Sequence, residues 1–181
     1  MFVRTGLIVS GLAATLAASA AADTVINNTV VTNTSNATAT FTVTNTFGPS
    51  NIVGPTFITG SVTGTVTDLT GDGATVGLAP NSSAIYSAFF NNGTELQKTL
   101  MNAPNFSFSA GQFLSNSTQP EQFFNLVAGN VTNNISITLT FTLTPGDSAS
   151  FTSIFTVVPV PAPGACVALV GLVALGRRRR D

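Results

Sequence analysis

Few side chains in this sequence have the chemistry for catalysis. The chain has no histidine and one cysteine, Cys166, so the Ser-His and Cys-His pairs that usually activate a nucleophile cannot form and most zinc sites lack ligands. Glu95 and Glu121 remain as candidates for a pair of carboxylates acting as acid and base. They lie on separate polar segments with no motif around either. We therefore expect no enzymatic activity, and a hydrolase that uses these two glutamates is the alternative.

Residues 68–73 place two acidic residues in a glycine-rich segment. Asp68 and Asp72 offer oxygen ligands of the kind that calcium prefers. The spacing lacks the denser Asp-x-Asp-x-Asp-Gly pattern of a calcium-binding loop, however. Asp72-Gly73 is also a turn signal in its own right. The sequence therefore predicts a solvated hairpin turn here, with no metal site and no cofactor.

Threonine recurs at every second position in two segments. Residues 38–44 and residues 138–144 carry threonine at their even positions. Because alternate side chains on a strand share a face, both segments are expected to present ordered rows of hydroxyl and methyl groups. An ordinary solvated strand face explains such rows, and flat arrays of this kind are also used by ice-binding proteins.

The elements that carry these residues are predicted to be strands. Apolar and polar residues alternate in residues 135–144 and 37–44, and in residues 58–66, where Gly60 and Gly64 take inward positions. This period of two indicates strands with one buried and one solvated face. Turn signals separate the strands at intervals that suit two packed sheets. The predicted fold class is all-β, an antiparallel Ig-like or jelly-roll-like β-sandwich.

Three segments depart from simple alternation. A capping-box pattern that begins at Thr94 predicts a helix over residues 94–102. Residues 120–127 fit either a short helix or a strand. Residues 78–90 and 143–155 resemble each other, each reading as a strand end, a proline turn and an aromatic-bearing strand, and they predict a repeated hairpin.

The charge of the central region excludes one class of partner. Residues 23–157 have a net charge of −5, because six acidic residues stand against Lys98 alone. A region without a basic patch cannot neutralise phosphates, so we expect no nucleic-acid binding. The acidic residues are Asp23, Asp68, Asp72, Glu95, Glu121 and Asp147.

The N-terminal segment has the parts of a secretory signal peptide. Arg4 is followed by an apolar stretch at residues 6–18, and small residues that include Ala20 and Ala22 precede Asp23. A basic start, a short apolar run and an A-x-A end are what signal peptidase recognises. The sequence therefore predicts a signal helix at residues 1–22 and a mature chain that begins at Asp23.

The C-terminal segment contains three features in a fixed order. The motif Pro161-Ala162-Pro163 comes first and is followed by an apolar run at residues 165–175. A basic cluster then closes the chain: Arg177, Arg178, Arg179 and Arg180. The run is a marginal membrane span, and arginines at its end favour a cytoplasmic C-terminus. We expect a sorting tail at residues 158–181, which leaves residues 23–157 as one sandwich domain.

This tail resembles the PEP-CTERM sorting signal of exported proteins of Gram-negative bacteria. The chain has Ala162 where that family usually has glutamate. The resemblance implies transient membrane insertion through a short transmembrane helix at residues 165–176, and processing by an exosortase-like transpeptidase. It also implies a structural or adhesive role at the cell surface or in the extracellular matrix, linked to exopolysaccharide or biofilm. Some families with this type of tail are named as ice-binding C-terminal domains. A polysaccharide- or ice-binding module is the alternative, and an uncleaved membrane anchor is the alternative for the tail.

Overall fold

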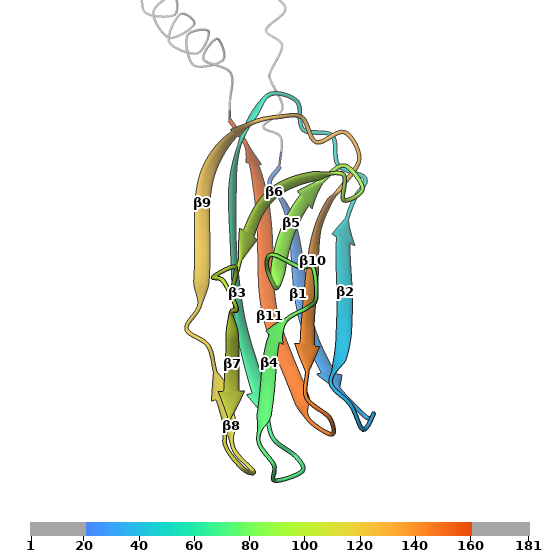
Figure 1. Ribbon diagram of the computed structural model, residues 1–181. Helices are drawn as coiled ribbons and strands as arrows, with labels where there is room; N and C mark the ends of the chain where they lie inside the picture. Colours follow the sequence, from blue (N-terminus) through green and yellow to red (C-terminus); the bar gives the residue numbers. More distant parts are fainter. Residues whose placement is uncertain (1–20, 161–181) are drawn as a thin grey trace, which may run out of the picture. The chain divides into compact units, whose positions relative to one another are not determined.

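The computed structural model describes residues 21–160, and within them the chain forms strands and no helix. The strands make two antiparallel sheets, so the described part of the chain is an all-β, sandwich-like fold (Figure 1). The strands are β1 (Asp23–Thr32), β2 (Ala39–Phe47), β3 (Pro55–Thr67), β4 (Ala74–Leu78), β5 (Tyr86–Phe90), β6 (Glu95–Leu100), β7 (Ser107–Ala110), β8 (Ser115–Ser117), β9 (Glu121–Ala128), β10 (Ile135–Leu143) and β11 (Ser148–Pro159).

Each sheet has four strand positions. In sheet A, β1 pairs with β11 and β11 with β3, while the far edge of β3 pairs with β9 and then β8. In sheet B, β2 pairs along the whole of β10, so β5 and β4 must share the other edge of β10. β6 and β7 continue outward from β5 and β4. The pairs β4–β5, β6–β7 and β8–β9 therefore act as three interrupted strands.

Aromatic rings fill the space between the two sheets. Phe141 of sheet B packs against Phe151 of sheet A with ring centroids 4.7 Å apart. Phe90 of sheet B also packs against Phe155 of sheet A, with ring centroids 6.0 Å apart. All four rings are almost completely buried. Packing of this kind adds to the large apolar area that aromatic side chains remove from water, so these contacts join the two sheets.

Tyr86 ties the sheets together through a polar contact. Its hydroxyl, on β5, donates a hydrogen bond of 3.1 Å to the carbonyl of Ile154 on β11. Burial raises the pKa of the Tyr86 phenol well above its usual range, because the charged form would lose its solvation. The phenol therefore stays protonated and remains a donor.

The predicted alternating strands are confirmed in all three segments, except that Ala37, Thr38 and Thr144 lie just outside them. Residues 135–143 form β10, residues 39–47 form β2, and residues 55–67 form β3. Gly60 and Gly64 lie at buried positions of β3, as expected. A Cβ added to Gly64 would approach Phe151 Cε1 to 2.8 Å and Phe108 Cζ to 2.9 Å. The absence of a side chain at Gly64 therefore leaves room for the rings of Phe108 and Phe151.

The helix predicted over residues 94–102 is wrong. Residues 95–100 form β6, which pairs with β5 through a register shift between Ala88 and Phe89. The Thr94 hydroxyl donates to the Asn91 carbonyl at 2.6 Å within the preceding turn, so Thr94 does not cap a helix. The edge of β5 was open to another strand, and pairing with it overrides the weak helical preference of a short segment.

The other two irregular segments are also resolved. Residues 121–128 form strand β9, which settles the choice between helix and strand. The repeated hairpin is wrong, because only one of the two similar segments changes direction. β10 and β11 lie in different sheets, whereas β4 and β5 follow each other along the same edge of β10. The shared residues reflect a shared turn composition and not a shared fold.

We predict that Gly64→Ala destabilises the sandwich by about 1–3 kcal/mol, because the methyl group overpacks the space between Phe108 and Phe151. Urea unfolding of residues 23–160 measures this. Gly129→Ala is the matched control, since a Cβ there meets nothing within 4 Å, and it should change stability by less than about 0.5 kcal/mol. Equal stability of the two variants would contradict the proposed packing role of Gly64.

Candidate functional site

The predicted sorting residues lie mostly outside the described part of the chain. Ala20, the motif Pro161-Ala162-Pro163 and the cluster Arg177, Arg178, Arg179 and Arg180 are all in segments 1–20 or 161–181. The same holds for the predicted signal helix and for the predicted transmembrane helix at residues 165–176. Ala22 is described and is exposed. Among the described residues, no helix is long and apolar enough to cross a membrane.

The described body begins and ends close to the predicted processing points. β1 starts at Asp23, directly after Ala22. β11 runs to Pro159, two residues beyond the predicted domain end at residue 157. The amide of Val160 then donates a hydrogen bond of 3.0 Å to the carbonyl of Pro55. The body therefore includes every residue up to the one before Pro161.

The two threonine rows lie opposite each other on the outer face of sheet B. β2 and β10 pair so that Thr44 faces Thr138, Thr42 faces Thr140 and Thr40 faces Thr142. The hydroxyls of Thr44 and Thr138 are 3.1 Å apart and hydrogen-bonded. The three threonines of β2 are exposed and those of β10 are partly exposed. We call these six residues the threonine array.

The array is suited to contact with a hydrated ligand. A hydroxyl donates one hydrogen bond and accepts two, so a hydroxyl that pairs with its neighbour keeps further capacity. The methyl groups between the hydroxyls add apolar contact area. Similar hydroxyl pairs cross sheet A at Thr24 and Thr156, 3.0 Å apart, and at Thr65 and Ser117, 2.7 Å apart. Both outer faces therefore offer dense, uncharged hydrogen-bonding surfaces.

An exposed apolar group occupies one end of the outer face of sheet A. Val158 of β11, Phe57 of β3 and Leu126 of β9 lie side by side in one row of the sheet. Phe124 lies in the next row and stacks on Phe57 with ring centroids 5.3 Å apart. Phe124 is 69% exposed and Leu126 is 60% exposed. We call these four residues the Phe57 patch.

The sequence held a signal for this patch. Phe123-Phe124 and Leu126-Val127 are adjacent apolar pairs. In a strand, adjacent residues point to opposite faces, so such pairs require apolar groups on both faces of the sheet. Because these pairs break the period of two, the sequence of β9 fits a helix as well as a strand.

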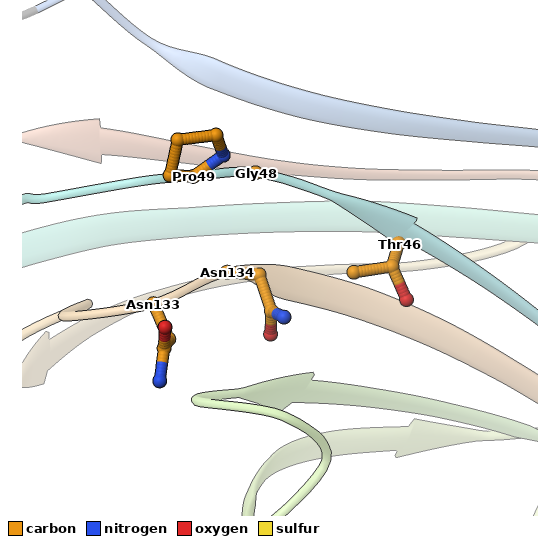
Figure 2. Close-up of a pocket in the computed structure, with 5 residues that line it drawn as sticks. All are labelled: Thr46, Gly48, Pro49, Asn133 and Asn134. Carbon is orange, nitrogen blue, oxygen red and sulfur yellow. The ribbon is translucent and has the colours of Figure 1, made fainter.

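A shallow polar hollow of about 290 Å³ lies at the end of sheet B (Figure 2). Gly48 and Pro49 line it from the segment after β2, and Asn133 and Asn134 line it from the segment before β10, with Thr46 completing the wall. The Asn134 amide is already engaged, since its Nδ2 donates to Asn92 Oδ1 at 2.6 Å and its Oδ1 accepts from the Asn92 amide at 2.7 Å. The Asn134 side chain therefore fixes the turn at Asn92 and is not free to bind a ligand in the hollow.

The two candidate catalytic glutamates are not brought together as a pair. Glu95 begins β6 in sheet B, and Glu121 begins β9 in sheet A. Glu95 Oε1 accepts a hydrogen bond of 2.8 Å from Asn91 Nδ2. Glu121 Oε2 accepts one of 2.7 Å from the amide of Met101. Each carboxylate thus holds a neighbouring turn or connection.

The prediction of a solvated hairpin turn at residues 68–73 is wrong in two respects. The segment joins β3 of sheet A to β4 of sheet B, so it crosses between sheets and is not a hairpin. Asp68 is also only 2% exposed. Its carboxylate accepts hydrogen bonds from four backbone amides, those of Thr70, Gly71, Gly73 and Phe113, at 2.7–3.2 Å. Its role is to organise this end of the sandwich.

These contacts change the pKa of Asp68. Burial disfavours the charged form and raises the pKa, but the backbone donors of Phe113, Gly71, Thr70 and Gly73 together outweigh burial. The net result is a pKa well below the usual range for aspartate. Asp68 therefore remains ionised in the folded protein.

Asp147 joins this cluster, a role that its turn sequence did not reveal. Its Oδ1 accepts from the Leu69 amide at 3.2 Å, and its Oδ2 accepts from the Thr144 hydroxyl at 2.6 Å. Oxygens of Asp68, Asp72 and Asp147 lie within 4.8 Å of one another, which is close enough to share a metal ion. However, polarised N–H groups already point at both oxygens of Asp68, and a cation would have to replace them. The donor set therefore fits a loop anchor better than a metal site.

Comparison with known proteins adds no relative. No family model matches the chain, and neither a curated protein nor a solved structure is significantly similar to it.

We predict that acid weakens the fold through Asp68. Its folded-state pKa lies below the ordinary value of 3.8. The ionised carboxylate therefore contributes its full stabilisation when the pH is above 3.8. This contribution is lost as the pH falls from there through the folded-state pKa. Urea midpoints measured between about pH 5 and about pH 2 should therefore fall more steeply for the wild type than for Asp68→Asn. The variant should be less stable at neutral pH. An equal dependence of the urea midpoint on pH in the wild type and in Asp68→Asn would contradict the stabilising role of the ionised Asp68 carboxylate.

Proposed function

We propose that this chain is an exported protein of the cell surface or extracellular matrix, sorted through its C-terminal tail by an exosortase-like transpeptidase. The observation that carries the proposal is that β11 ends at Pro159, before the proline motif begins. The last backbone hydrogen bond described, from Val160 to Pro55, comes one residue before Pro161. Cutting at the proline motif would leave every described strand intact.

The N-terminal boundary supports the same proposal. Signal peptidase cleavage after Ala22 would release Asp23 as the first residue of β1. Asp23, the first residue of β1, is held in place because its carboxylate accepts a hydrogen bond from the Ser50 hydroxyl. Removal of both predicted signals would thus leave a body that starts and ends with strand residues.

We propose a structural or adhesive role for this body, with exopolysaccharide as its partner. The support comes from the two hydroxyl-rich outer faces, which offer many weak, uncharged contacts in place of one deep pocket. Polysaccharide chains also carry many hydroxyls, and these can exchange hydrogen bonds with the hydroxyls of such faces. We also propose that the sandwich is of the jelly-roll kind. Counting the interrupted strands as one each gives eight positions, in the orders β1-β11-β3-β9 and β2-β10-β5-β6, as two Greek keys require.

We predict that the exported protein begins at Asp23 and lacks the cluster from Arg177 to Arg180. Mass spectrometry of the protein recovered from the cell surface or the medium measures both ends. Replacing Pro161 and Pro163 with alanine should leave the N-terminus unchanged and retain the C-terminal arginines. Arginines on the mature wild-type protein would refute sorting and indicate an uncleaved anchor.

The threonine array supports a second candidate, the binding of ice or another ordered hydrated surface. Residues spaced by two along a strand repeat about every 6.6–6.8 Å, and neighbouring strands lie about 4.7–4.9 Å apart. The register of β2 and β10 places threonines at both spacings. Strand twist limits how far such an array stays flat, so a two-strand array favours a small contact area.

We predict that Thr42→Lys weakens binding to either kind of ligand, because the long charged side chain stands up from the centre of the array. A loss of about tenfold would correspond to about 1.4 kcal/mol of binding free energy. Thr34→Lys is the matched control, since Thr34 is also exposed but lies in the connection between β1 and β2, outside both sheets. Polysaccharide binding assays and freezing hysteresis on the same samples separate the two ligands. Equal binding by both variants would exclude the array as the site.

A further inference from the structure

The Phe57 patch is a contiguous exposed apolar group at one end of the outer face of sheet A. Beyond it, the outer face of sheet A carries rows such as Thr67 with Ser115 and Thr65 with Ser117. Exposure of Phe124 and Leu126 to water is unfavourable, because their side chains are apolar. The stacking of Phe57 on Phe124 keeps both rings at the surface. A contiguous apolar group of this kind marks a contact surface.

The position of the patch identifies what it contacts. Val158, one of its four members, is only seven residues before Ala165, where the apolar run of the tail begins. A fully extended chain of seven residues spans at most about 25 Å. While residues 165–176 are inserted, the patch therefore cannot move more than about that distance from the lipid. A short tether of this kind also gives a high effective concentration of the membrane at the patch.

We propose that the Phe57 patch docks on the surface of the lipid bilayer while the tail is inserted, and so holds Pro161-Ala162-Pro163 at the boundary between membrane and water. This inference rests on the proposed insertion of the tail. Aromatic and aliphatic side chains bury in the interfacial region of a bilayer, and the binding strength grows with the apolar area that they bury. Val160 is fixed to Pro55 by a hydrogen bond, so a docked patch leaves little slack before the motif. The motif is then presented at the height at which a membrane transpeptidase works.

Phe113 provides a matched comparison within the same molecule. It is 72% exposed, against 69% for Phe124. Its amide donates to Asp68, which follows the last residue of β3, whereas Phe57 lies near the first. The ten residues from Phe57 to Thr67 separate the two ends of β3 by about 33 Å. A membrane at the patch should thus be out of reach of Phe113.

The test uses single tryptophans, because the natural chain has none. Phe124→Trp and Phe113→Trp are made in the chain that retains its tail and are reconstituted in phosphatidylcholine–phosphatidylglycerol vesicles with brominated acyl chains. We expect at least twofold quenching and a blue shift for the tryptophan at position 124, and neither for that at position 113. Adding Leu126→Ser to Phe124→Trp should reduce the quenching.

Reaction of Cys166, the only cysteine, with a membrane-impermeant maleimide reports insertion of the tail separately. Protection of Cys166 without quenching at position 124 would overturn docking and leave the sorting proposal standing. Free reaction of Cys166 with quenching at position 124 would show that the patch binds lipid without an inserted tail, which overturns both insertion and the proposed docking during insertion. A blue shift at position 124 that depends on protein concentration but not on brominated lipid would show that a second copy covers the patch, which also overturns docking.

Discussion

The structure depends on the layer of aromatic rings that separates its two sheets. Phe90, Phe141, Phe151 and Phe155 are almost fully buried there and touch across the gap. Packed sheets lie about 10 Å apart. Rings of this size fit into that distance only if some of the residues that face them have no side chain. Gly60 and Gly64 are those residues. Because the interior holds the two sheets together, both outer faces are left free for contact with other molecules.

The outer faces are hydrated largely by hydroxyl groups, because the region from residue 23 to residue 157 has few charged side chains. Threonine and serine occupy the solvated positions, where they satisfy each other across strands and still bind water. The few acidic residues serve structure instead. Asp68 and Asp147 hold the connections at one end, and Glu121 holds the connection after β6. Charge is therefore used for loop geometry, and the hydroxyls cover the surface.

The fold class followed from the sequence where one face of a strand was buried and the other solvated. β10 and β2 were predictable because apolar residues alternate strictly with threonine. β6 and β9 were not, since β6 is a short, largely exposed edge strand and β9 has apolar residues on both faces. The pairing of the two threonine rows depends on register, and the Asp68 cluster joins residues far apart in the chain. Neither relation leaves a local pattern for periodicity to reveal.

The route by which the chain leaves the sandwich has a mechanical consequence. β11 is an inner strand, bonded to β1 on one side and to β3 on the other along nearly its whole length. A pull on Val160 along the strand axis loads both ladders in shear, so many hydrogen bonds must fail together before the strand slips. A protein held at its C-terminus and loaded through its outer faces would therefore resist force well. Tension applied at Val160 thus falls on a strand that is paired on both sides.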